Sequence, residues 1–170
     1  MDGEGTIVSA APASVGSAAP AFTLPDQVGR PRSLESLTTE RAVLLTFFPF
    51  AFSGICTGEL REIRDELSRF DNDRVHVVAI SCDPMFALRA WDDQEAFFFP
   101  LLSDFWPHGE VARSYGVWHE EGGFAARGTF LVDTSGTVAW TLINEPGRRR
   151  SFEGVDAAVA ALPGPSELAE

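Results

Sequence analysis

The chain has 170 residues, of which 45% are hydrophobic and 22% charged, and this composition is typical of a single globular domain. Its net charge of −12 argues against a nucleic acid or an acidic membrane as a partner, and it allows a small neutral substrate. We therefore expect one folded domain at residues 15–163, between a flexible N-terminal tail at 1–14 and a short C-terminal tail at 164–170.

The two cysteines, Cys56 and Cys82, form no C-x-x-C motif, and the three histidines are not spaced to bind zinc with them. The N-terminal residues are rich in Ala, Ser and Gly and lack the basic segment of a secretory leader. Free cysteines persist in a reducing compartment. We therefore expect a cytoplasmic protein that binds no metal.

The N-terminal part of the chain predicts an edge hairpin, one helical turn and a buried strand. Residues 15–29 have the pattern of a short strand followed by a turn. Ser33 is a suitable N-cap for a single helical turn at 33–37. The run at 42–48 is continuously apolar apart from Thr46 and is too short to cross a bilayer, so it predicts a strand buried on both faces.

An amphipathic helix follows this strand, and its first turn contains Cys56. Apolar residues recur at helical spacing with charged residues between them, which predicts one continuous helix: Leu60, Ile63, Leu67 and Phe70. A second buried strand at 75–81 completes a right-handed βαβ unit. Cys56 therefore lies at the C-terminal end of a central strand, where α/β sheets bind ligands and where a helix N-terminus stabilises a thiolate.

The rest of the chain predicts further helices and a C-terminal hairpin. Asp83 and Pro84 suit the N-cap and the first position of a helix. The later segments are an extended stretch at 97–104, a short helix at 109–115, hairpin strands at 128–133 and 137–143, and a helix at 152–162. In the hairpin loop, Gly136 supplies the left-handed conformation. The order β-α-β-α-β-β-α predicts an α/β protein with a thioredoxin-like fold, an N-terminal β-hairpin extension and an insertion before the C-terminal β-hairpin.

The segment Pro49-x-x-x-Ser53-x-x-Cys56 resembles the active-site signature of peroxiredoxins, Pro-x-x-x-(Thr/Ser)-x-x-Cys. Further segments that are similar to this family follow in the same order as in the family: 16–24, 47–49, 100–104, 115–117 and 126–130. The resemblance extends over residues 15–162. Residues 52–60 and 102–109 are most similar to the one-cysteine, AhpE-type (alkyl hydroperoxide reductase E-like) peroxiredoxins.

This resemblance implies a thiol peroxidase that reduces hydrogen peroxide, organic hydroperoxides or peroxynitrite without a cofactor. The Cys56 thiolate would attack the O–O bond and become a sulfenic acid. Pro49 would cover the sulfur, and the Ser53 hydroxyl would bind the peroxide. Arg127 would lie beside Cys56 and donate to a peroxide oxygen, and Glu59 would hold the guanidinium in place.

The resemblance also bears on how Cys56 is reduced again. It implies a low-molecular-weight thiol such as mycothiol, or a glutaredoxin-like partner such as mycoredoxin, as the reductant. Cys82 follows the strand at 75–81 and could instead resolve the sulfenic acid through a disulfide. A disulfide needs Cα atoms within about 7 Å, however, and a helix start and a strand end rarely come that close. The aromatic run 97–99 exceeds what a small core readily absorbs, so we expect a homodimer.

Each candidate residue also has a simpler structural interpretation. Cys56 would be a small buried hydrophobe, and Ser53 would act only as a helix N-cap. By default Arg127 is a solvated charge on a strand, and Glu59 is an ordinary helix-surface residue. The three arginines at 148–150 are either a solvated basic turn or the source of a second cation for the pocket.

Two other functions are compatible with the sequence. The first is a thiol–disulfide oxidoreductase, against which the lack of a C-x-x-C motif counts. The second is a redox-sensing or chaperone-like protein of thioredoxin fold in which Cys56 is the sensor. Slow oxidation by peroxide, comparable to that of free cysteine, would favour the sensor.

Overall fold

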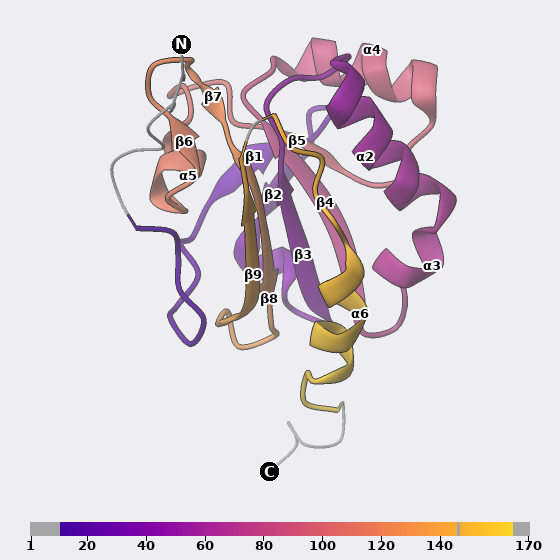
Figure 1. The fold of residues 1–170 in the computed structure, drawn as a ribbon, viewed down its shortest axis with the longest axis vertical. Coiled ribbons are helices and arrows are strands. Elements are labelled where there is room, and N and C mark those ends of the chain that lie inside the picture. The colour runs from indigo at the N-terminus through magenta and orange to yellow at the C-terminus, as the bar shows by residue number, and fades with distance from the viewer. Residues whose placement is uncertain (1–10, 146, 165–170) are drawn as a thin grey trace.

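A five-stranded sheet lies at the centre of the protein, with its strands in the order β5–β4–β3–β8–β9 (Figure 1). Strands β3 (Ala42–Phe47), β4 (Val75–Ser81) and β5 (Leu101–Ser103) run parallel to one another. Strand β8 (Arg127–Val132) pairs antiparallel with β3 and with β9 (Val138–Asn144). The C-terminal ends of the three parallel strands therefore lie at the same edge of the sheet as the N-terminal end of β8.

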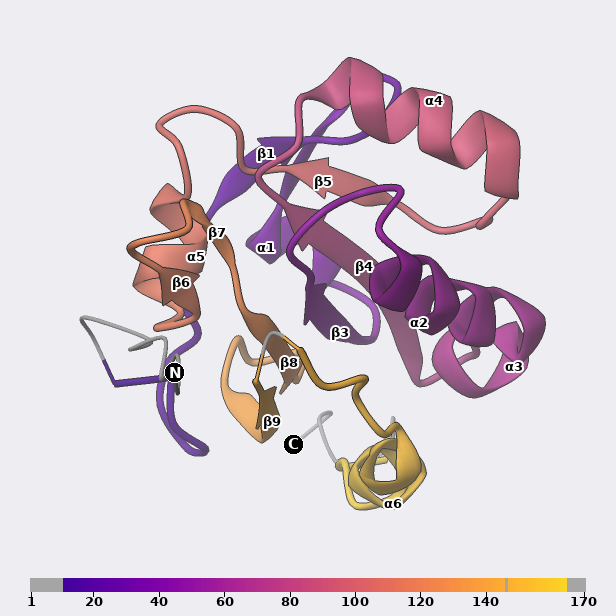
Figure 2. The same ribbon diagram turned by 45° about the horizontal axis from the view of Figure 1, so that its top comes forward.

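Helices cover one face of this sheet, on the right in Figure 2. They are α2 (Gly54–Asp65), α3 (Leu67–Phe70), α4 (Met85–Glu95) and α6 (Glu153–Ala160). Their apolar residues join the sheet in one hydrophobic core, which includes Cys56, Leu60, Trp91 and Val155.

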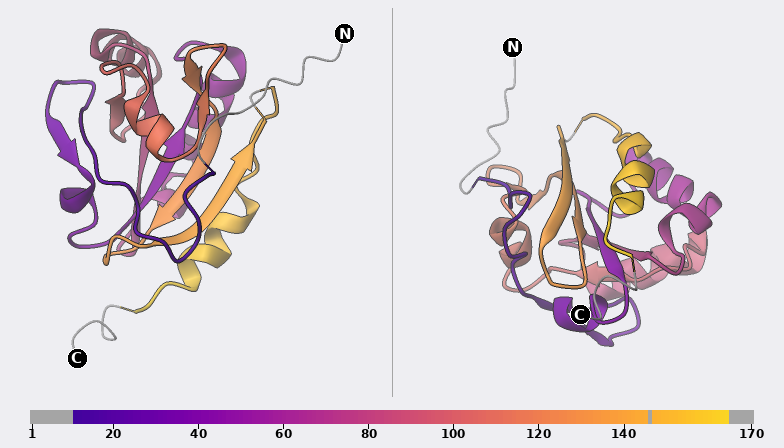
Figure 3. Two further views of the ribbon diagram at one scale, coloured as in Figure 1. Left: turned by 90° about the vertical axis from the view of Figure 1, so that its left-hand side faces the viewer. Right: turned by 90° about the horizontal axis from the view of Figure 1, so that it is seen from below.

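Smaller elements cover the opposite face, as the two views of Figure 3 also show. They are the single turn α1 (Leu34–Leu37), the short helix α5 (Glu110–Ser114), the ribbon of β6 (Trp118–His119) and β7 (Phe124–Ala125), and the N-terminal hairpin of β1 (Thr23–Pro25) and β2 (Pro31–Ser33). The β6–β7 ribbon was not predicted, and together with α5 it forms the insertion before the C-terminal hairpin.

Strand β3 contributes to both cores because successive side chains of a strand point to opposite faces. Every residue of β3 is buried, as its continuously apolar sequence predicted. Val43, Leu45 and Phe47 enter the core under α5, whereas Ala42 and Leu44 enter the core under α2. The same alternation continues along β4 and beyond its end, so the side chains of Val78, Ile80 and Cys82 enter the core under α5.

Three predicted elements differ in the structure. The predicted helix through Phe70 is interrupted at Glu66, which caps α2 and precedes α3. Asp83 is not the N-cap of α4, because that position belongs to Pro84 and the helix begins at Met85. The stretch 97–104 is a strand only at β5, since the backbone turns at Phe98, whose φ is 66°.

The predicted turn chemistry is confirmed at Ser33 and at Gly136. Ser33 caps α1 in a capping box with Ser36. Gly136 has a φ of 79°, in the left-handed region, and lies in the loop between β8 and β9. These local signals are reliable because the conformation depends on the residues of the turn themselves.

The computed structural model describes residues 11–145 and 147–164. Most of both predicted tails, residues 1–10 and 165–170, lies outside the described residues. The backbone N–H of Ala13 donates to the carbonyl oxygen of Tyr115 at 3.2 Å. The domain boundaries at 15 and 163 stay a prediction. No helix within the described ranges is long and apolar enough to cross a membrane.

Candidate active site

Cys56 is the third residue of α2, in the first turn of this helix, which follows the loop after β3. Its side chain is fully buried, in the core under α2. Ser53 is the N-cap residue of this helix and has an extended backbone, but its side chain does not cap the helix. The Ser53 hydroxyl instead donates to the carbonyl oxygen of Phe50 at 3.0 Å.

Arg127 meets Cys56 although 71 residues separate them in sequence: its Nη2 donates to Cys56 Sγ at 3.3 Å. The pairing of strands accounts for this contact. Thr46, near the end of β3, pairs with Thr129, so the first residue of β8 lies beside the loop that leads to α2. Arg127 is only 3% exposed, which rules out the interpretation as a solvated charge.

Glu59 lies one helical turn after Cys56 and is fully buried, so it is not an ordinary helix-surface residue. Its Oε2 accepts from Arg127 Nη1 at 2.8 Å and from Arg150 Nε at 3.0 Å. Its Oε1 accepts from the backbone N–H of Arg150 at 2.8 Å. One carboxylate therefore orients two guanidinium groups.

Arg150 is a second buried arginine beside Cys56, and the sequence left open whether any of the arginines at 148–150 turns inward. Its guanidinium also donates to Thr129 Oγ1 at 2.8 Å and to the carbonyl oxygens of Gly128 and Phe47. Burial lowers the pKa of Arg150, and the Glu59 carboxylate opposes this effect. Its neighbour Arg149 is exposed and pairs with Glu62 at 2.9 Å.

A hollow of about 460 Å³ opens above these residues. It is lined by Pro49, Phe50, Ser53, Gly54, Ile55, Phe124, Arg127 and Gly147. The hollow thus joins the loop after β3, the start of α2, the β6–β7 ribbon and the start of β8. Sequence reasoning missed Phe124, because nothing in its local pattern indicates that the insertion folds over the loop.

Cys82 lies on the opposite side of the sheet from Cys56, in the core under α5. Both cysteines are free and buried. Burial, together with the carboxylates of Asp104 and Asp83, raises the pKa of the Cys82 thiol to about 12. The folded protein therefore offers no direct path for a disulfide between them.

The histidines lie away from this cluster. His76 is half-buried, with Nε2 at 2.6 Å from the carbonyl oxygen of Leu37. His108 Nε2 lies 2.8 Å from the carbonyl oxygen of Gly123, between β6 and β7, and His119 belongs to β6, where its ring stacks on Phe124. Within residues 11–145 and 147–164, no three His, Cys, Asp or Glu side chains are grouped so that they could hold a metal ion.

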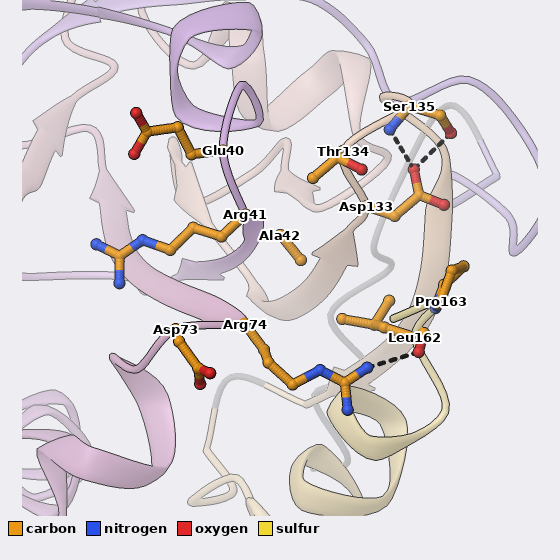
Figure 4. A pocket seen from close by; sticks show the side chains of 10 residues that line it. All are labelled: Glu40, Arg41, Ala42, Asp73, Arg74, Asp133, Thr134, Ser135, Leu162 and Pro163. Carbon is orange, nitrogen blue, oxygen red and sulfur yellow. Dashed lines mark hydrogen bonds between the residues drawn. The ribbon is translucent and has the colours of Figure 1, made fainter. Parts of the chain in front are cut away.

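A second hollow, of about 170 Å³, lies at the other end of the sheet (Figure 4). It is lined by Glu40, Arg41, Ala42, Asp73, Arg74, Asp133, Thr134, Ser135, Leu162 and Pro163. Arg74 donates to the carbonyl oxygen of Leu162 at 2.6 Å, and Asp133 accepts from Ser135. These contacts are structural, and the lining contains no nucleophilic thiol.

Comparisons with known proteins identify relatives of the chain. A sequence profile of the AhpC/TSA family matches residues 15–141. Proteins named alkyl hydroperoxide reductase E, from Mycobacterium tuberculosis and Mycobacterium bovis, are 47% identical over 149 residues, which are 88% of this chain and 97% of theirs.

Solved structures show the same fold. Peroxidoxin BcpB from Mycobacterium tuberculosis superimposes with a TM-score of 0.78 at 30% identity, over 89% of this chain and 99% of that one. The reduced 2-Cys peroxiredoxin of Plasmodium vivax has a TM-score of 0.78 at 24% identity, over 88% of this chain and 82% of that one. These likenesses confirm the predicted thioredoxin-like α/β fold.

Proposed function

Because the chain belongs to the AhpC/TSA family of peroxiredoxins, it is a thiol-dependent peroxidase, and we propose that Cys56 is the residue that attacks the peroxide. The observation that carries this assignment is the Arg127 guanidinium, which donates to Cys56 Sγ at 3.3 Å. A buried thiol at a helix start, with a buried cation on its sulfur, is in a position that stabilises a thiolate.

The charges of the buried cluster support a thiolate at Cys56. Arg127 and Arg150 carry two positive charges, and Glu59 carries one negative charge. Buried charge is costly unless it is balanced. A thiolate at Cys56 brings the sum of the four groups to zero.

In the proposed reaction, Cys56 Sγ attacks one oxygen of the peroxide. An S–O bond forms while the O–O bond breaks, and the sulfur is oxidised by two electrons to a sulfenic acid. The leaving oxygen takes the proton that the thiol released when it ionised, and departs as water or an alcohol. With peroxynitrite, the leaving group is nitrite. Arg127 donates to the peroxide oxygens. The Ser53 hydroxyl, whose proton is donated to Phe50, accepts from the peroxide O–H, and Pro49 shields the sulfur from water.

Oriented donors contribute more to this rate than ionisation of the thiol. A free cysteine with a pKa of about 8.5 is already partly ionised at neutral pH, so complete ionisation gains only about tenfold. One donor aimed at the oxygen that gains charge is worth about 10²-fold to 10³-fold. The Arg127 guanidinium is therefore the larger contribution.

The lining of the 460 Å³ hollow bears on the substrate. Phe50, Ile55 and Phe124 are apolar residues of this lining, and Arg127 and Ser53 are its polar side chains. Hydrogen peroxide and peroxynitrite suit the polar side chains, and the apolar side chains suit the carbon chain of an organic hydroperoxide.

We propose that an external reductant restores Cys56, because Cys82 lies across the sheet from it. Mycothiol or another low-molecular-weight thiol fits an open hollow, as does a thiol carried by a mycoredoxin-like or glutaredoxin-like protein. Both cysteines are free, which fits a reducing cytoplasm.

We propose a homodimer in which the second copy covers the aromatic side chains around the hollow. Phe50, Phe52, Phe86, Phe105 and Trp106 are exposed in loops and at a helix start along the C-terminal edge of the parallel strands. The run 97–99 no longer supports the dimer, because Phe97 and Phe99 are buried in the core and only Phe98 is exposed.

The proposal is tested by mixing the reduced protein with hydrogen peroxide or tert-butyl hydroperoxide in a stopped-flow instrument. We expect oxidation at least about 10²-fold faster than that of free cysteine, with a mass increase of one oxygen atom on Cys56. Cys56→Ser should abolish turnover, and the matched variant Cys82→Ser should keep it with an external thiol.

Turnover that survives in Cys56→Ser would sink the assignment. Oxidation as slow as that of free cysteine would favour the redox-sensing alternative. Loss of turnover in Cys82→Ser, with an external thiol present, would make Cys82 the resolving cysteine.

A further inference from the structure

The loop between β3 and α2, residues 48–53, carries two of the proposed site residues and is held to the rest of the protein through a backbone amide. The N–H of Ala51 donates to Oδ2 of Asp83 at 2.9 Å. Pro49 has no N–H, and both the N–H and the hydroxyl of Ser53 donate to Phe50 within the loop. The N–H of Phe48, where the loop leaves β3, donates to the carbonyl oxygen of Ile80 at 3.0 Å. The Ala51 amide is a second donor, three residues further along the loop, and it reaches the residue that follows the end of β4 by two positions.

Asp83 is itself fixed by neighbours that leave its acceptor oxygen little freedom. Ser81, at the end of β4 and fully buried, donates its hydroxyl to the same Oδ2 at 2.6 Å. The Ser81 hydroxyl also accepts from the Asp83 backbone N–H at 3.2 Å. Ser103 in β5 donates to the carbonyl oxygen of Asp83 at 2.6 Å. Two strands of the rigid sheet thus hold this carboxylate in place.

The anchored amide lies between two aromatic residues that face different parts of the molecule. Phe50 contacts Phe124 of β7, with ring centroids 5.0 Å apart, and lines the 460 Å³ hollow together with Arg127. The ring of Phe52 packs against Trp91 of α4, with ring centroids 6.0 Å apart. Phe52 also has a φ of 67°, a strained conformation for a bulky residue that persists only when the surroundings impose it.

We propose that Asp83 is a positioning residue for the peroxide pocket, which acts through the Ala51 amide to hold Pro49 and Ser53 over Cys56. The inference rests on the proposed function, since it concerns the same pocket. Asp83 touches neither the sulfur nor the substrate. Without its acceptor oxygen, the strained Phe52 relaxes and the loop moves away from the geometry in which the donors face the peroxide.

The test compares Asp83→Ala with Asp83→Asn. Both hydrogen bonds to the Asp83 carboxylate end on one oxygen, Oδ2, so the amide oxygen of Asn can replace it without the charge. We expect Asp83→Ala to lower the rate constant for Cys56 oxidation by peroxide about tenfold to a hundredfold, because small displacements of reacting groups have effects of this size. Asp83→Asn should restore most of the rate.

The matched control is Asp133→Ala. Asp133 accepts from Ser135 and Thr137 in a turn at the far end of the sheet, so this variant removes similar hydrogen bonds without touching the loop. Its rate constant with peroxide should stay that of the wild type. Alkylation of Cys56 by iodoacetamide, which needs no aligned peroxide, should fall far less in Asp83→Ala than the peroxide rate does.

Hydrogen exchange of the reduced protein gives a measurement that needs no peroxide. Peptides that cover residues 49–55 should exchange faster in Asp83→Ala and at the wild-type rate in Asp83→Asn. If the wild type does not react with peroxide, the proposed function fails, and exchange alone decides whether Asp83 anchors the loop.

A folded Asp83→Ala with the wild-type rate constant or wild-type exchange at 49–55 would overturn the inference. If Asp83→Ala does not fold, Ser81→Ala takes its place, since it removes one of the two donors that fix Oδ2. Ser81→Ala should lower the rate constant with peroxide and speed the hydrogen exchange of residues 49–55, both by less than Asp83→Ala would. An unchanged rate constant would count against the positioning role.

Discussion

At the scale of single residues, the site depends on how one carboxylate divides its hydrogen bonds. Glu59 accepts from Arg127 and from both the side chain and the backbone of Arg150, and all three residues are buried. Arg150 also reaches Phe47 and Thr129, on the two strands that flank the site. Arg150 therefore ties the C-terminal segment to the place where β3 and β8 meet.

Arg150→Ala should destabilise the protein and slow the reaction with peroxide. The substitution leaves buried acceptors unpaired, for which we expect a loss of about 3 kcal/mol in the free energy of unfolding. It also removes a positive charge near Cys56, so the rate constant should fall about tenfold. Urea unfolding and stopped-flow oxidation measure the two effects.

The neighbouring Arg149→Ala is the control, because Arg149 is exposed and pairs with Glu62 at the surface. It should change the free energy of unfolding by less than about 0.5 kcal/mol and leave the rate constant unchanged. Equal effects of the two variants would contradict the role of Arg150.

At the scale of elements, Asp104 joins the end of β5 to α5. Its carboxylate accepts from the backbone N–H groups of Val111 at 3.1 Å and Ala112 at 2.9 Å, in the first turn of the helix. The residue is almost fully buried, and burial raises the pKa of its carboxyl group to about 6. The hydrogen bonds from the helix oppose this rise without cancelling it.

The raised pKa makes stability depend on pH in a definite direction. Between about pH 4 and pH 6 the folded protein keeps a proton on Asp104 that the unfolded chain releases, so this carboxyl group lowers stability as the pH rises. In Asp104→Asn this dependence is lost. The variant should be less stable than the wild type at pH 4, and the difference should shrink by about 1–3 kcal/mol by pH 7.

Urea unfolding of both proteins at pH 4, 5, 6 and 7 measures this change. The difference between the two proteins removes the contribution of the other titrating groups. A difference that stays constant or grows with pH would show that the Asp104 pKa is not raised.

At the scale of the whole molecule, the proposed active site and the proposed dimer interface lie at the same edge of the sheet. The antiparallel pairing of β3 with β8 brings Arg127 to Cys56, and exposed aromatic side chains gather along the same edge. Large exposed apolar areas in soluble proteins mark binding surfaces. The proposed dimer would therefore form beside the hollow.

Trp106→Glu should convert the proposed dimer into a monomer. Trp106 is 81% exposed, and burying a carboxylate in an apolar interface is costly. Phe98→Glu is the control, since Phe98 is 74% exposed but lies between α4 and β5, away from that edge. Sedimentation velocity should show a monomer for the first variant and a dimer for the second.

A wild-type protein that sediments as a monomer would contradict the dimer itself. A Trp106→Glu dimer would show that the second copy covers a different surface.

The sequence by itself determined the local features. The apolar run of β3, the bounds of β4 and the loop with Gly136 depend on residues that are close neighbours in the chain, and their patterns predicted them. Resemblance to a family then selected Cys56 and Arg127 as partners. Neither periodicity nor charge could have joined two residues 71 positions apart.

Only the tertiary structure decided which of several similar residues has a role. The three arginines at 148–150 carry the same charge, yet Arg150 is buried and donates to Glu59, whereas Arg149 is exposed. Asp83 has the sequence signature of a helix cap but accepts from the loop over Cys56. The reason is physical: a local pattern fixes a backbone conformation, whereas a buried partner depends on which distant segment the fold brings to the same edge of the sheet.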